Sequence, residues 1–240
     1  MTNKEYANRF LKDWDNGERI FTLTTSGSTG IPKNIELKRE FLEISAKATA
    51  DHLHLDSREN IFCCLPVNKM GGLMMLVRAK VLGCNIEICD PVSDPMVLLD
   101  EFHKFTFVSL VPLQLYEIFK NQESINKLNR FKNVLIGGAE IDKQLELKVR
   151  QLHVTAWHTY GMTETYSHIA LRKLNGSETS DYFTPMEGVT IKRDERGCLM
   201  IKAVVTNNEF IITNDLAEIN KEGNFKISGR FDLVINSGGN

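Results

Sequence analysis

The sequence lacks several features that mark specialised classes of protein. Its 240 residues carry a formal net charge of only −2, which argues against a protein whose main partner is nucleic acid or an anionic membrane surface. No apolar run reaches the roughly 20 residues that a membrane span needs, because Arg78 and Lys80 interrupt the best candidate, residues 71–83. The polar N-terminus has no apolar stretch typical of a signal peptide. We therefore expect a cytoplasmic protein with no membrane span.

Cysteine is also scarce. There are five cysteines, two of them adjacent at Cys63 and Cys64, and none forms a CxxC pair or a Cys/His cluster with zinc spacing. An odd number without such spacing argues against a disulfide framework and against a structural metal site. Reduced, buried thiols are the simpler interpretation.

Short β-like segments alternate with helical segments as far as residue 160. This alternation predicts βαβ units, and therefore an α/β fold in which helices flank a parallel sheet. The expected strands are residues 20–25, 60–67, 85–89, 105–111, 133–136 and 153–158, and the expected helices are residues 3–13, 39–54, 72–82, 113–120 and 142–152.

The pattern changes after Asn175. Residues 176–181 are rich in Gly, Ser and Thr, and beyond them the sequence predicts hairpins without helices, with strands in residues 190–192, 199–205, 210–219 and 224–228. We expect an α/β body in residues 1–175, followed by a smaller antiparallel β subdomain in residues 176–240.

The strongest local motif is the run from Thr24 to Lys33, TTSGSTGIPK, which follows an expected strand. Hydroxyl and backbone N–H donors close to a lysine are typical of a phosphate-binding loop. The run differs from the GxxxxGK[ST] loop of P-loop NTPases, because the lysine is displaced and no Ser or Thr follows it. A flexible Ser/Gly loop is the simpler alternative, but Pro32 and Lys33 do not suit a linker.

Further polar residues follow the ends of expected strands, where ligands of parallel sheets collect. Glu164, in the run Tyr160–Thr165, could hold Mg²⁺ beside a triphosphate, although a helix N-cap is an alternative. The small residues of 137–140 would let a purine lie against the backbone. Asp215 and Arg230 offer groups that bind a ribose diol. Each of these segments alone is a common loop or hairpin element.

Taken together and in this order, the motifs resemble the adenylate-forming superfamily of acyl- and aryl-CoA ligases, luciferases and peptide-synthetase adenylation domains. The resemblance covers Thr24 to Asn240. It implies the fold of the large N-terminal domain of such an enzyme, without the C-terminal lid domain that carries the family's catalytic lysine. It also implies a two-step reaction, in which ATP activates a carboxylic acid to an acyl-adenylate and coenzyme A then displaces AMP.

The resemblance assigns a role to individual residues. Those implied in catalysis are Lys33, Glu164 and Thr165, with Glu164 as the magnesium ligand and Thr165 near the α-phosphate. The implied nucleotide-binding residues are Thr25, Ser26, Gly27, Ser28, Thr29 and Gly30 for the phosphates, Gly137, Gly138, Ala139, Glu140, Tyr160 and Gly161 for the adenine, and Asp215 and Arg230 for the ribose. Asp232 occupies the hinge position about which the lid domain rotates.

Within the superfamily, Met162, Ser167 and His168 follow the pattern of the o-succinylbenzoate–CoA ligases of menaquinone biosynthesis. Their substrate has a second carboxylate, which must be recognised, and the candidate residues are Lys69, Ser167, His168 and Arg172. A solvated surface charge, or for His168 a core histidine, is the alternative for each. Many relatives carry a histidine or an aromatic residue near Lys69, so a lysine there is a departure that suits an anionic acid.

Two other functions remain open at this stage. One is an acyl- or aryl-CoA ligase with the same ATP site and a different acid pocket. The other is a nucleotide-binding module with little catalysis of its own, because the lid domain would lie beyond Asn240; the isolated chain is expected to be impaired. The expected partners are the carboxylic acid, ATP with Mg²⁺, and coenzyme A, and formation of a homo-oligomer is left open.

Overall fold

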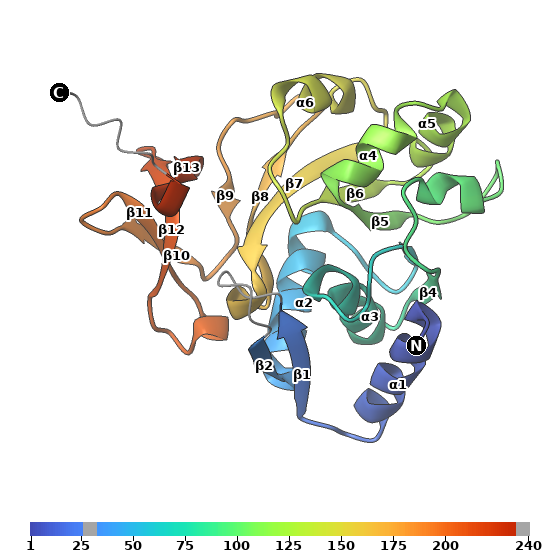
Figure 1. Cartoon of the computed structure of the whole chain (residues 1–240), viewed down its shortest axis with the longest axis horizontal. Coiled ribbons are helices and arrows are strands. Elements are labelled where there is room, and N and C mark those ends of the chain that lie inside the picture. The colour runs from blue at the N-terminus through green and yellow to red at the C-terminus, as the bar shows by residue number, and fades with distance from the viewer. Residues whose placement is uncertain (26–32, 234–240) are drawn as a thin grey trace.

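A computed structural model describes residues 1–25 and 33–233, which form two sheets and a hairpin (Figure 1). The large sheet has seven strands in the order β4-β3-β5-β6-β7-β8-β9. Its strands are β3 (Asn60–Cys63), β4 (Asn85–Ile88), β5 (Phe107–Leu110), β6 (Asn133–Ile136), β7 (Thr155–Met162), β8 (Ser167–Lys173) and β9 (Thr184–Pro185). The strands from β4 to β7 are parallel, which confirms the predicted fold class.

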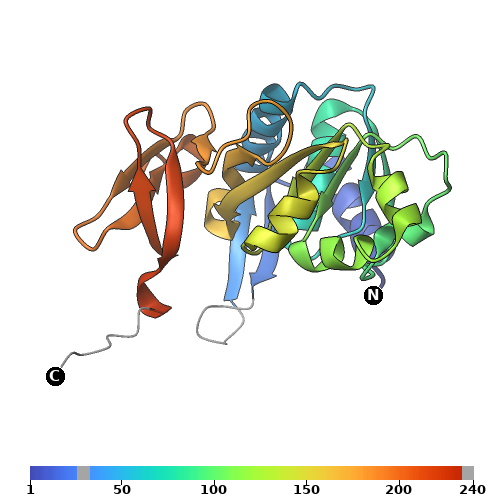
Figure 2. The ribbon, with the colours of Figure 1, turned by 90° about the horizontal axis from the view of Figure 1, so that it is seen from above.

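Helices cover both faces of this sheet (Figure 2). On one face lie α1 (Asn3–Asp15), α2 (Arg39–Leu53) and α3 (Met70–Leu82), and on the other α4 (Pro112–Ile118), α5 (Gln122–Leu128) and α6 (Lys143–Val149). A short 3₁₀ turn, η1 (Pro95–Leu98), precedes β5. Asp142 caps α6, since its carboxylate accepts from the amides of Gln144 and Leu145 at 2.8 and 2.9 Å.

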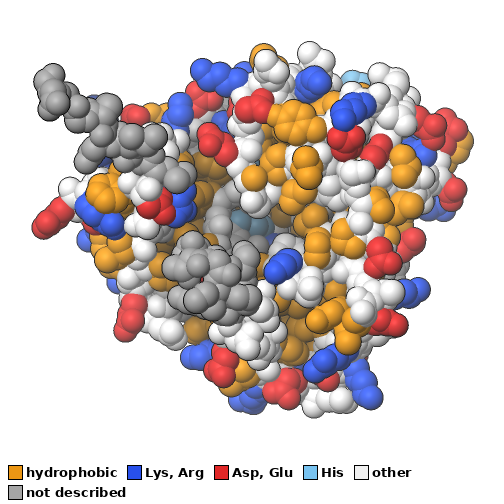
Figure 3. Space-filling model, in the orientation of Figure 1, with side chains coloured by type: hydrophobic (Ala, Val, Ile, Leu, Met, Phe, Trp, Pro, Cys, Tyr) orange, Lys and Arg blue, Asp and Glu red, His pale blue; other side chains and the backbone are white. Residues whose placement is uncertain are grey.

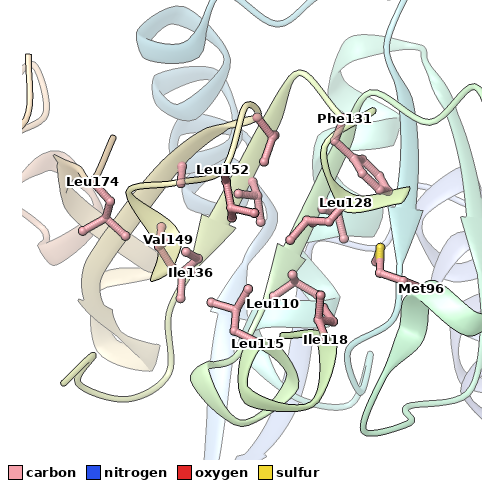
Figure 4. Close-up of a cluster of buried hydrophobic side chains, with 14 of the residues drawn as sticks. Met96, Leu110, Leu115, Ile118, Leu128, Phe131, Ile136, Val149, Leu152 and Leu174 are labelled. Atoms are coloured by element: carbon pink, nitrogen blue, oxygen red, sulfur yellow. The ribbon is translucent and has the colours of Figure 1, made fainter. Parts of the chain in front are cut away.

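Alternate residues of the central strands face opposite helix layers. Val108 and Val134 pack in the core under α4, α5 and α6, part of which Figure 4 shows. Their neighbours Phe107 and Leu135 pack against α2 and α3. All four are at most 3% exposed, because both faces of a parallel sheet are covered. Burial on both faces holds these strands in place, and the candidate site lies at the carboxyl end of the sheet.

The sequence pattern predicted no strand of the large sheet after β7, but two more strands follow it. β8 pairs antiparallel with β7, and β9 pairs antiparallel with β8. β8 is buried along almost its whole length, so it lacks the alternation of polar and apolar residues by which an edge strand is predicted. Because β9 lies in residues 184–185, the large sheet extends past residue 175, where we placed the end of the α/β body.

A separate hairpin leads to α2. β1 (Ile20–Thr25), which was predicted, pairs antiparallel with β2 (Lys33–Lys38), which was not. Thr25 and Lys33 are partners in this register, so the predicted phosphate loop connects two neighbouring strands rather than a strand and a helix. Its residues 26–32, among them Ser26, Gly27, Ser28, Thr29 and Gly30, lie outside the described residues.

The small sheet is antiparallel throughout, as predicted. Its strands pair in chain order, and it lies beside the large sheet in both ribbon views (Figures 1 and 2). Phe183 and Phe225 join the two sheets through paired backbone hydrogen bonds of 2.6 and 3.0 Å. The strands are β10 (Thr190–Arg193), β11 (Cys198–Lys202), β12 (Ile211–Ile219) and β13 (Phe225–Arg230), accompanied by the 3₁₀ turns η3 (Val204–Thr206) and η4 (Phe231–Leu233).

Charged side chains of both signs are interspersed over the face shown in Figure 3. Within residues 1–25 and 33–233, no helix has the length and apolar character needed to cross a bilayer.

Candidate functional site

The predicted nucleotide residues gather at the carboxyl ends of β6 and β7. β6 pairs with the first half of β7 only, up to the partners Ile136 and His158. The turn 137–140 therefore begins where β6 ends, and Tyr160 lies just beyond the same edge. This is the place where ligands bind to parallel sheets.

Tyr160 connects the large sheet to the small one. Its hydroxyl donates to Oδ2 of Asp215, on β12, at 2.5 Å, and its ring packs edge-on against Phe225 with centroids 5.1 Å apart. Burial, and then the hydrogen bond and negative charge of Asp215, raise the pKa of the Tyr160 hydroxyl well above its usual value. Tyr160 is therefore a neutral donor at any physiological pH.

Asp215 is also held from the other side. Its Oδ1 accepts from Nη1 of Arg230 at 3.1 Å, while Nε and Nη2 of Arg230 each donate to the carboxylate of Asp232 at 2.9 Å. The hydrogen bonds of Arg230 lower the pKa of Asp232. The structure thus brings four predicted residues, Tyr160, Asp215, Arg230 and Asp232, into one continuous chain of contacts.

The turn after β6 requires small residues for steric reasons. A Cβ atom on Gly137 would lie 2.2 Å from Oγ1 of Thr159, and Gly138 has a φ of +82°, which favours glycine. Ala139 accepts a weak hydrogen bond of 3.4 Å from Nε2 of His158, and Glu140 is exposed. The turn offers backbone and open space to a flat ligand.

His158 lies under this turn beside Arg172. Nη2 of Arg172 donates to Nδ1 of His158 at 3.3 Å and to Glu146 of α6 at 2.9 Å. Burial and the positive charge of Arg172 lower the pKa of His158 to about 4. Arg172 is 8% exposed, and its charge is balanced by Glu146.

This buried histidine predicts a pH dependence of stability. In the unfolded chain His158 regains a pKa near 6.5, so below that pH the unfolded state binds more protons and the folded state loses stability. The loss begins near pH 6.5 and continues down to about pH 4. Between pH 7 and pH 5, His158→Gln should lose about 2 kcal/mol less unfolding free energy than the unsubstituted chain. Denaturant titrations at both pH values measure this difference.

His153→Gln is the matched control, because that side chain is exposed; it should keep the original pH dependence. Glutamine at position 158 can still donate to Ala139 and accept from Arg172. Equal pH dependence in His158→Gln and the unsubstituted chain would contradict the prediction.

The predicted metal ligand lies just beyond the carboxyl end of β7. Glu164 is in the 3₁₀ turn η2 (Thr163–Thr165) directly after that strand, and its side chain is exposed. Thr165, next to it, is fully buried, and its hydroxyl contacts backbone atoms of Met162 and Ser167. Gly161 lies close to the following strand, since a Cβ there would meet the carbonyl oxygen of Ser167 at 2.1 Å.

Ser167 and His168 contact a residue that no sequence motif marks as functional. Arg78 of α3 donates through Nη2 to Oγ of Ser167 at 3.5 Å and to Oγ1 of Thr49 at 3.3 Å. Thr49 also lies 3.0 Å from Nε2 of His168. Arg78, Ser167 and His168 therefore form one polar cluster between the sheet and the α2–α3 layer. The sequence feature that could have pointed to Arg78 is its position as the single arginine of an otherwise largely apolar helix.

The charge of Arg78 is unusual for its position. The residue is 2% exposed, its Nε has no hydrogen-bond partner, and no carboxylate of residues 1–25 or 33–233 forms an ion pair with it. Burial lowers its pKa to about 10, so it stays charged at neutral pH. Burial and this charge lower the pKa of His168 well below its usual value, so that ring is neutral. A buried, unmatched cation is costly unless it meets an anion.

The other predicted acid-binding residues lie elsewhere. Lys69 immediately precedes α3, and its Nζ donates to the carbonyl oxygen of Thr24, at the end of β1, at 3.3 Å. Arg78 follows it by nine positions, which is about 13.5 Å along a helix. Arg172 contacts α6, on the opposite face of the sheet from α2 and α3. The structure therefore groups Ser167 and His168 with Arg78, and not with Lys69 or Arg172.

A small apolar cavity of about 70 Å³ adjoins this cluster. It is lined by parts of α2, β8 and η3, and His168 and Thr165 both contribute to its wall. Ser45, also in the wall, is buried and its hydroxyl has no hydrogen-bond partner. The cavity therefore places mostly apolar side chains, with one unpartnered hydroxyl, next to the polar cluster.

The comparison with protein families identifies the family of the chain. The family model described as AMP-binding enzyme matches residues 4–206. The chain belongs to the AMP-binding enzyme family. Its fold is the mixed α/β fold of the N-terminal domain of adenylate-forming enzymes, as the sequence motifs predicted.

Individual members of the family show how much of them the chain matches. It is 27% identical over 239 residues to the 2-succinylbenzoate–CoA ligase of Staphylococcus aureus strain MSSA476, covering 90% of the chain and 48% of that enzyme. The crystal structure of an acyl-CoA synthetase (AMP-forming)/AMP-acid ligase II-like protein from Dyadobacter fermentans matches with a TM-score of 0.87 and 41% identity, over 98% of this chain and 66% of that one.

The structure of o-succinylbenzoate coenzyme A synthetase (MenE) from Bacillus subtilis, in complex with ATP and magnesium ion, matches with a TM-score of 0.74. At 22% identity over 91% of this chain and 51% of that one, it supports the fold alone. The chain spans about half the length of the curated relatives that it matches.

Proposed function

We propose that this AMP-binding chain forms the nucleotide and acid site of a ligase that activates a carboxylic acid with ATP and Mg²⁺, and that the acid is o-succinylbenzoate. The acyl-adenylate so formed would pass to coenzyme A. The observation that carries the choice of acid is the buried, unmatched Arg78 beside Ser167 and His168. The S. aureus ligase to which the chain is similar bears the name of the same acid.

In this proposal the nucleotide spans the two sheets. The adenine lies between the turn 137–140 and Tyr160, and the ribose diol donates to Asp215, whose carboxylate can accept hydrogen bonds beyond those of Tyr160 and Arg230. The phosphates extend towards Thr25 and Lys33, at the ends of the hairpin strands. Asp232 stays the proposed hinge residue.

Glu164 fits the role of a ligand for nucleotide-bound Mg²⁺. It is one exposed carboxylate at a strand end, and Mg²⁺ usually binds one or two carboxylates together with substrate phosphates and water. The ion would neutralise charge on the phosphates when the acid attacks. The B. subtilis relative has been described with ATP and magnesium ion bound.

The acid is recognised through its second carboxylate. An o-succinylbenzoyl group has one carboxylate that joins the nucleotide and another that stays ionised. Arg78 can bind that anion with two parallel N–H donors, and the hydroxyl of Ser167 can add a donor beside it, next to the neutral ring of His168.

Calorimetry on the 240-residue chain tests this choice. The probe is a sulfamate analogue of o-succinylbenzoyl adenylate, and the control ligand is the same molecule without its second carboxylate. We expect the probe to bind at least roughly tenfold more tightly, as a charge-assisted pair contributes about 1.5–3 kcal/mol. Equal affinity would refute the proposed acid while preserving the nucleotide site. Failure of AMP itself to bind would refute the whole proposal.

Pyrophosphate exchange across a panel of carboxylic acids distinguishes the remaining alternative. Exchange with a fatty or simple aromatic acid, and none with o-succinylbenzoate, would assign the chain to another acyl- or aryl-CoA ligase.

A further inference from the structure

The backbone just after Glu164 is strained. Tyr166 has a φ of +54° and Ser167 a φ of +106°, and neither residue is glycine. Left-handed conformations cost free energy in residues that have a β carbon, and two in succession persist only where the surroundings hold them. Other contacts must therefore offset the free-energy cost of these two backbone conformations.

The hydroxyl of Thr165 is one such group. It accepts from the amide of Met162 at 2.9 Å, and its proton faces the carbonyl oxygens of Ser167 at 2.7 Å and Met162 at 3.1 Å. A hydroxyl has a single proton, and the nearer acceptor is Ser167. Since Thr165 is fully buried, these backbone contacts occupy its hydroxyl.

Neighbouring residues hold the same turn from two further directions. The phenol oxygen of Tyr166 accepts from the amide of Lys38, at the end of β2, at 3.2 Å, and its ring packs edge-on against Phe41 of α2 at 5.3 Å. Gly161 permits the close approach of the Ser167 carbonyl. The strained conformation is thus determined by several contacts that Thr165 completes.

The turn determines where two functional side chains lie. Glu164 precedes it and is exposed, whereas Ser167 is its last residue and has a hydroxyl that lies 3.5 Å from Nη2 of Arg78. We infer that Thr165 is a positioning residue, whose hydroxyl locks the turn so that Ser167 meets Arg78 while Glu164 stays on the nucleotide side. This role rests on the proposed function of the site, and it differs from the α-phosphate contact that the family resemblance implied.

The chain contains a second turn of the same form, which serves as an internal control. In η3, Oγ1 of Thr206 accepts from the amide of Ala203 at 3.0 Å and donates to the carbonyl oxygen of Glu209 at 2.7 Å. The residues after it, Asn207 and Asn208, have φ values of +53° and +57°. Thr206→Val therefore removes an equivalent hydroxyl from an equivalent turn that carries neither Glu164 nor Ser167.

The experiment compares Thr165→Val, Thr165→Ser and Thr206→Val in the 240-residue chain. Without ligand, NMR carbon shifts of Tyr166 and Ser167 report their backbone conformation; they should change in Thr165→Val and be retained in Thr165→Ser and Thr206→Val. With ligand, Thr165→Val should weaken the sulfamate probe by roughly tenfold and AMP by less than about threefold. Thr165→Ser should restore the affinity for the probe, and Thr206→Val should leave the ratio of the two affinities unchanged.

Three outcomes would overturn the inference. Unchanged carbon shifts in Thr165→Val would show that the hydroxyl does not lock the turn. Changed shifts with an unchanged affinity ratio would show that the turn does not position the acid site. An equal loss of AMP and probe binding would indicate a direct phosphate contact. If the unsubstituted chain binds AMP but not the probe, the proposed acid is wrong, and the carbon shifts alone decide whether Thr165 locks the turn.

Discussion

Arg78→Met should weaken binding of the o-succinylbenzoyl sulfamate probe by roughly a hundredfold, because removing one partner of a buried charge pair costs about 2–5 kcal/mol. AMP, which has no second carboxylate, should bind as before. The ligand-free variant should be at least as stable as the unsubstituted chain, since an apolar side chain of similar length replaces a buried cation with no paired carboxylate among the described residues. Calorimetry and denaturant titration measure the two effects separately.

Lost binding together with retained stability would identify Arg78 as an anion receptor. A purely structural arginine would lose stability when it is replaced, and would affect both ligands alike. Arg130→Met is the matched control, because that arginine is exposed and its guanidinium lies over Phe102; it should change neither affinity. Undiminished probe binding in Arg78→Met would remove Arg78 from the acid site.

The second large effect concerns the ribose. Asp215→Asn should weaken AMP binding by roughly a hundredfold, because the amide loses the charge that strengthens hydrogen bonds from the diol, and its NH₂ group opposes the donors Tyr160 and Arg230. The specific signature is the preference for AMP over an analogue without ribose hydroxyls. The unsubstituted chain should show that preference in calorimetry and Asp215→Asn should largely lose it.

Glu218→Gln provides the control for this substitution. Glu218 lies on the same strand, β12, and accepts a hydrogen bond of 2.9 Å from the hydroxyl of Tyr182. It therefore reproduces a tyrosine–carboxylate pair outside the candidate site, and its loss should leave AMP binding unaltered. If Asp215→Asn keeps the full preference for the ribose hydroxyls, Asp215 does not bind the diol.

The structure brings together more of the expected nucleotide-binding residues than of the expected acid-binding residues. Gly137 and Glu164 follow β6 and β7 as expected, because the periodicity of a buried parallel sheet also locates the edge at which its ligands bind. Tyr160 was expected after its strand but lies inside β7, which ends four residues later than predicted. Arg78 was passed over because nothing local shows that it has no carboxylate partner among the described residues. Arg172 was assigned to the acid, but its partner Glu146 lies 26 residues away in sequence, on a helix whose packing no local pattern reveals.

Strands that the sequence pattern did not predict also depend on contacts between residues of different elements. β8 follows the Tyr160–Thr165 motif through a turn made by Tyr166 and Ser167 in left-handed conformations, without the Gly, Asn or Asp residues by which such turns are predicted. Its antiparallel pairing with β7 depends on contacts that Gly161 and Thr165 make with the backbone of Ser167. The secondary-structure propensities of the individual residues do not reveal those contacts.

Arg230 links the nucleotide site to the last described turn of the chain. Because its guanidinium is shared between Asp215 and Asp232, a ligand that draws on Asp215 alters how firmly η4 is held against the small sheet. Binding free energies are reciprocal, so whatever stabilises one arrangement of η4 must change nucleotide affinity by the same factor. Because Asp215 and Asp232 share one guanidinium, motion at the proposed hinge position would be coupled to occupancy of the proposed nucleotide site.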